Sequence, residues 1–102
     1  MNLEIKIVAR TDRPTIKFKV VKQHRKLRGS STKLITSYNG WGLYSVCHPK
    51  ISVRHKYLLI RGESNSEDRK YSKEVTCESF EERDRVLEIM QKLVENVNKM
   101  EL

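Results

Sequence analysis

Apolar and charged residues alternate with a period of two in residues 3–7 and again in residues 16–20. This period places successive side chains on opposite faces, which is typical of a half-buried β-strand. The turn-forming sequence Asp12-Arg13-Pro14 separates the two segments, so they predict a β-hairpin. We expect its outer face to carry three lysines: Lys6, Lys17 and Lys19.

Further strands are predicted at about residues 33–38, 41–48, 51–61 and 70–77. Asn39 and Gly40 both tolerate the positive φ that a two-residue type I′ turn requires. A hairpin with this turn places Tyr38 opposite Trp41. In the strand expected at 51–61, the odd-numbered apolar positions favour one face.

The C-terminal segment predicts one long helix. Ser79 and Glu82 fit a capping box, in which Ser79 accepts from an early backbone N–H and Glu82 reaches back. The acidic residues of the first turn suit the positive end of the helix. A stripe with helical spacing follows, formed by Val86, Leu87, Met90, Leu93, Val94 and Val97.

These elements predict an α+β protein with a single domain over residues 1–102. An antiparallel sheet of about five or six strands, connected as a meander or by hairpins, is expected over about residues 2–77. It packs against the C-terminal helix at about residues 79–100. Charged residues interrupt the N-terminus, and no apolar run approaches the roughly 20 residues of a transmembrane helix. We therefore expect a soluble, cytoplasmic protein.

Cys47, His48, His55 and Cys77 are the candidate metal ligands. Zinc sites use paired short spacings, whereas adjacent residues on a strand point to opposite faces. We therefore expect no metal and no cofactor. Two widely spaced cysteines fit a reducing compartment, although the sequence leaves a disulfide between them open.

The chain contains no G-x-S-x-G, no phosphate-binding glycine loop and no H-E-x-x-H. His24 has basic neighbours that would suit RNA cleavage, but no acid–base partner can be identified for it. A metal-dependent nuclease needs clustered carboxylates, and these are nearly absent from the first 62 residues. We do not expect an enzyme.

Charge is distributed unevenly along the chain, whose formal net charge is +8. Residues 1–62 contain 14 Lys and Arg against 2 acidic residues, and residues 63–102 contain 7 against 11. The densest basic segment is 22–33, with five Lys or Arg. Such asymmetry indicates a polyanionic partner for the basic part.

We therefore predict a basic binding protein that contacts nucleic acid or the nucleic-acid path of a nucleoprotein complex. Tyr38 and Trp41 would stack on bases if they are exposed; otherwise they pin the hairpin register as a cross-strand pair. The absence of RNP and GXXG motifs gives no support for sequence-specific reading. The predicted phosphate contacts are Lys17, Lys19, Lys22, Arg25, Lys26, Arg28 and Lys33.

Two alternatives stay open. The first is a protein-interaction or inhibitor module, of the kind that viruses and mobile elements encode, docking on an acidic surface of a host protein. The second follows from the element order, which resembles the pleckstrin-homology fold in outline and would imply an anionic lipid as the ligand. An unpaired edge strand would also allow a homodimer.

Overall fold

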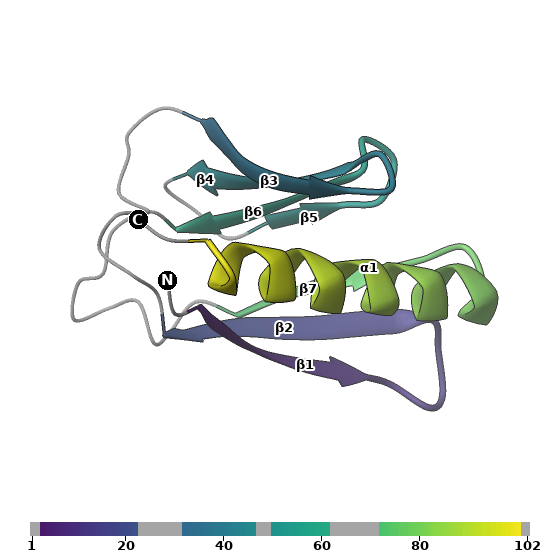
Figure 1. Ribbon diagram of the computed structural model, residues 1–102. Helices are drawn as coiled ribbons and strands as arrows, with labels where there is room; N and C mark the ends of the chain where they lie inside the picture. The colour runs from purple at the N-terminus through teal and green to yellow at the C-terminus, as the bar shows by residue number, and fades with distance from the viewer. Residues whose placement is uncertain (1–2, 23–31, 47–49, 62–71, 101–102) are drawn as a thin grey trace.

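The computed structural model describes residues 3–22, 32–46, 50–61 and 72–100 (Figure 1). It confirms the α+β class and the C-terminal helix. The described residues form β1 (Glu4–Ala9), β2 (Thr15–Lys22), β3 (Lys33–Tyr38), β4 (Trp41–Val46), β5 (Lys50–Ser52), β6 (Tyr57–Arg61), β7 (Ser72–Thr76) and α1 (Phe80–Asn98).

The prediction of one continuous sheet is wrong, because the strands form two sheets. The first sheet has the order β1-β2-β7, and the second has the order β3-β4-β6-β5. The predicted hairpin of β1 and β2 is confirmed, but β7 then returns to pair with the other edge of β2. The chain is therefore not a meander, in which consecutive strands lie side by side.

The second predicted hairpin is confirmed in its register. Tyr38 lies opposite Trp41, and the two turn residues have positive φ, 50° at Asn39 and 80° at Gly40. Both values suit the type I′ turn that the Asn-Gly sequence predicts. Beyond this hairpin the sheet departs from the antiparallel prediction, because β4 and β6 are parallel.

The single strand predicted at 51–61 is two strands separated by a turn at residues 53–56, where Lys56 has a φ of 56°. Ile51 and Leu58 are both buried in the core. An unbroken strand would place residues at this odd separation on opposite faces. Because of this turn, the prediction that the odd-numbered apolar positions of residues 51–61 share a face is wrong. It also returns β6 between β4 and β5, parallel to β4.

Helix α1 begins at the predicted cap. The Ser79 hydroxyl accepts a hydrogen bond from the Glu82 N–H at 3.0 Å, and the Glu82 carboxylate accepts from the Glu78 N–H at 2.9 Å. The predicted stripe is buried at Val86, Met90, Leu93 and Val97 and half-buried at Leu87 and Val94. Ile89, which is not part of the predicted stripe, is also buried.

The helix lies between the two sheets and completes one core with both of them (Figure 1). It packs mainly against β3 on one side and β1 on the other, and β5 lies near β7. Apolar side chains from both sheets meet those of the helix. The largest fully buried side chains from the strands are Ile16, Phe18, Leu43, Leu58 and Ile60.

The end of the helix is bound directly to the start of the first sheet. The Leu3 N–H donates to the Asn98 side-chain oxygen at 2.6 Å, and the Asn98 amide nitrogen donates to the Leu3 carbonyl at 2.9 Å. The side-chain amide of Asn98 thus satisfies both backbone groups of Leu3, as a neighbouring strand would. This pair fixes the helix alongside β1.

Candidate functional site

Three lysines lie on the outer face of the three-stranded sheet, as the hairpin pattern predicts. We call Lys6, Lys17 and Lys19 the lysine face. All three are exposed, whereas Ile16 and Phe18, which alternate with them on β2, are buried. The period-two alternation of β2 thus places its lysines in solvent and its apolar residues in the core.

Two of these lysines are direct cross-strand neighbours. Lys6 on β1 lies opposite Lys19 on β2, and Lys17 lies opposite Glu74 on β7. Within the described part of the chain, none of the three lysines forms an ion pair within 4.0 Å. Like charges directly opposite each other destabilise a sheet, so the Lys6–Lys19 pair favours the approach of an anion.

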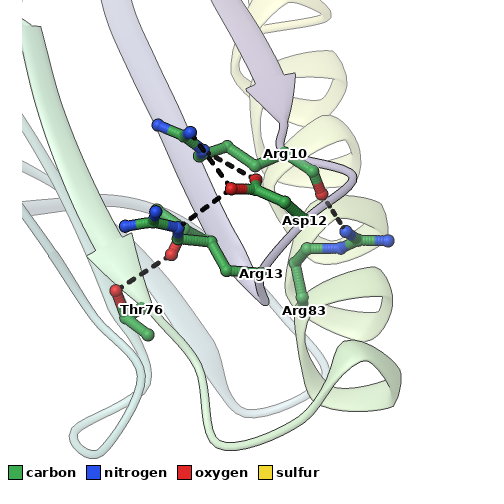
Figure 2. A network of polar contacts seen from close by, with 6 residues as sticks. Arg10, Asp12, Arg13, Thr76 and Arg83 are labelled. Atoms are coloured by element: carbon green, nitrogen blue, oxygen red, sulfur yellow. Dashed lines mark hydrogen bonds and ion pairs between the residues drawn. The ribbon is translucent and has the colours of Figure 1, made fainter.

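The turn between β1 and β2 has a different electrostatic character. Figure 2 shows Asp12 between the guanidinium groups of Arg10 and Arg13, with separations of 3.0 Å and 3.3 Å. The hydrogen bond from Arg10 lowers the pKa of the Asp12 carboxyl below its ordinary value. The acid at the centre of this cluster therefore partly neutralises its two arginines.

Arg83 attaches the helix to this turn. Its guanidinium donates to the Arg10 carbonyl (Figure 2). It also donates to the Asp84 carboxylate, at 2.7 Å for the shorter of two bonds. It also lies 4.9 Å from the centre of the Phe80 ring. The bond to the Arg10 carbonyl joins α1 to the first hairpin, whereas the contacts with Asp84 and Phe80 lie within the helix.

The two aromatic residues predicted to stack lie at the tip of the β3–β4 hairpin. Trp41 is only 5% exposed and belongs to the core, so it does not meet the condition of exposure. Tyr38 is half-buried and packs against the core, and both residues line a hollow of about 270 Å³ beside α1. Their positions agree with the other interpretation, a cross-strand pair that pins the register.

A second group of aromatic residues, to which sequence reasoning assigned no binding role, lies on the outer face of the four-stranded sheet. Tyr44 on β4 and Tyr57 on β6 are half-buried, with ring centroids 6.3 Å apart and planes at 90°. Tyr57 is also stacked on the exposed His55 ring, at 6.2 Å and 16°. Their positions, alternating with buried Leu43 and Leu58, are the signal that could have identified them.

The other predicted phosphate contacts are not brought together by the described structure. Lys33 is exposed at the start of β3, on the other sheet from the lysine face. Lys22 ends β2 opposite Glu4, but its side chain is outside the described residues. Arg25, Lys26 and Arg28 are also outside them.

Two of the four candidate metal ligands, Cys47 and His48, lie outside the described residues. Within the ranges that the structure covers, no three His, Cys, Asp or Glu residues cluster as metal ligands would. Cys77 is a free, buried thiol, and burial raises its pKa. No helix among the described residues is long and apolar enough to cross a bilayer.

Comparisons with known protein families, with curated proteins and with solved structures found no match to this chain.

Proposed function

We propose that this protein binds nucleic acid, with the lysine face in contact with phosphates. The observation that carries the proposal is the direct opposition of Lys6 and Lys19, with no acidic partner within ion-pair distance among the described residues. Phosphate contacts from Lys and Arg supply most of the sequence-independent affinity for nucleic acid. The +8 net charge would further assist the encounter.

The distribution of acidic residues indicates which surface of the protein an anion would approach. Helix α1 carries five acidic residues against three basic ones. On the outer face of the three-stranded sheet, Glu4 and Glu74 lie on the two edge strands, whereas Lys17 and Lys19 lie on the central strand. A polyanion would therefore approach the centre of this sheet rather than the helix.

The experiment is a titration of labelled single-stranded and duplex oligonucleotides at several salt concentrations between about 50 and 200 mM. A site with about 6–10 phosphate contacts would lose about 10³- to 10⁵-fold in affinity over this range. In the double variant Lys17→Gln/Lys19→Gln, the slope of log Kd against log salt should fall by about 2, because each lysine accounts for about one unit.

The matched control is Lys92→Gln/Lys99→Gln, which removes the same charge from the helical side. Both of these lysines pair with Glu95, at 3.7 Å and 3.1 Å. The control should keep the salt slope of the unmodified protein. Equal losses in the two double variants would reduce the effect to net charge, and no binding at low salt would refute the proposal.

One observation favours the protein-binding alternative. Val8 lies opposite Lys17 on the same face and is 60% exposed, which offers a protein partner an apolar contact. A partner of this class would remain bound after nuclease treatment and would be lost on Val8→Ser.

The lipid alternative is tested with vesicles that contain anionic lipids. It rested on a meander of strands, and the observed strand order is not a meander.

A further inference from the structure

The outer face of the four-stranded sheet combines aromatic rings with positive charge. Tyr44 and Tyr57 lie on the two central strands, and Leu34, 52% exposed, lies opposite Tyr44. Lys50 on β5 lies opposite Leu59, is exposed and forms no ion pair within the described residues. We call this surface the aromatic face and define it by Leu34, Tyr44, Tyr57, Leu59 and Lys50.

We propose that the aromatic face binds the unpaired bases of single-stranded nucleic acid. This inference rests on the proposed function, adds a second contact surface on the other sheet and names the class of substrate. Base–aromatic stacking is tolerant of sequence because every base has a π-face, and a neighbouring cation provides a contact for the backbone. A duplex keeps its bases stacked inside, where residues on a sheet face do not reach them.

The charge of this surface favours nucleic acid over an ordinary peptide partner. None of the described positions whose side chains point outward from these four strands is an Asp or Glu. Tyr44, Tyr57 and Lys50 are present instead, with His55 in the adjoining turn. Aromatic faces combined with cations, without acidic residues, are the composition of single-strand binding surfaces.

Local contacts hold the rings in place. The Ser52 hydroxyl accepts from the His55 N–H and lies 3.2 Å from His55 Nδ1, which positions the imidazole beside Tyr57. The Tyr44 ring lies over Gly42, since a Cβ added at residue 42 would be 2.6 Å from Tyr44 Cε2. Gly42 therefore leaves the space that the Tyr44 ring occupies.

The experiment compares two labelled probes of equal length and charge, an oligo(dT) of about 15 nucleotides and an abasic oligonucleotide that lacks the bases. The unmodified protein should bind oligo(dT) at least roughly 5-fold more tightly than the abasic probe. Tyr44→Leu and Tyr57→Leu should each lower the affinity for oligo(dT) by roughly 5- to 100-fold and leave the abasic affinity unchanged. The control Tyr38→Leu, at the hairpin tip, should keep the preference for oligo(dT).

A second variant protects the test against loss of folding. Gly42→Ala keeps every aromatic residue and every charge but displaces the Tyr44 ring, so it should also lower the preference for oligo(dT). Circular dichroism of each variant, with retained affinity for the abasic probe, shows that the protein is folded.

The outcomes separate this inference from the proposed function. Equal affinity of the unmodified protein for both probes would refute the base site and leave the phosphate contacts standing. Failure to bind either probe at low salt would refute both proposals. A dimer that forms in sedimentation experiments and is dissociated by Leu34→Lys would assign this face to a second copy and overturn the inference. A preference for oligo(dT) that survives both tyrosine variants would also overturn it.

Discussion

Asn98 satisfies two backbone groups that lie far from it in the sequence. If its side-chain amide is removed, the Leu3 N–H and carbonyl lose their partners in a partly buried position. Asn98→Ala should therefore lower the free energy of unfolding by about 1–3 kcal/mol, measured by urea denaturation. The control Asn96→Ala, two residues earlier in the same helix, should change it much less, and equal effects would show that the bonds to Leu3 contribute nothing.

At the scale of single residues, the sequence predicts the exposure of the lysines correctly but does not predict the exposure of the aromatic residues. Lys6, Lys17 and Lys19 follow directly from the alternation of β1 and β2. Trp41 is different, because its burial depends on the helix that packs over the hairpin, and no local pattern contains that helix. Tyr57 was missed because the turn at 53–56 reverses the parity of the strand.

The helix depends on its buried stripe, and Leu93 at its centre is 0% exposed. Leu93→Ala should lower the free energy of unfolding by about 2–5 kcal/mol, because the truncation leaves a cavity between the two sheets. Thermal denaturation measures this change. The exposed Glu88→Gln should remain within about 0.5 kcal/mol of the unmodified protein, and an unchanged melting temperature for Leu93→Ala would contradict the packing described above.

At the scale of elements, the sequence predicts local structure and fails at non-local pairing. The two hairpins and the capped helix are each specified within about 20 consecutive residues, by Asn39-Gly40 or by Ser79 and Glu82 for example. The return of β7 to β2 and the insertion of β6 between β4 and β5 join strands that are distant in sequence. Period-two alternation shows which residues of a strand share a face, but it does not specify which strand lies beside it.

The whole molecule has one core to which both sheets and the helix contribute, so it should unfold as one unit. Trp41 reports on the hairpin tip, and the far-ultraviolet circular dichroism signal reports mainly on α1. We expect the urea transitions followed by Trp41 fluorescence and by circular dichroism to coincide. Two separate transitions would indicate that the sheets are stabilised independently.

At the scale of the whole molecule, the charge asymmetry of the sequence indicates the class of partner but not where the charges lie in the structure. The basic composition of residues 1–62 indicates an anionic partner, but those residues supply strands to both sheets. The described cations of this segment are therefore divided between the lysine face, the first turn and the second sheet. Only the pairing of β1 with β2 shows that Lys6 and Lys19 are neighbours.

The position of α1 between the sheets has a consequence for synthesis. All seven described strands precede the helix in the sequence, so they leave the ribosome before the element that fills the space between them. Until Asn98 has emerged and can reach Leu3, the inward side chains of both sheets face water. The nascent chain is then most exposed to aggregation, and a chaperone that recognises apolar strands would act in that interval.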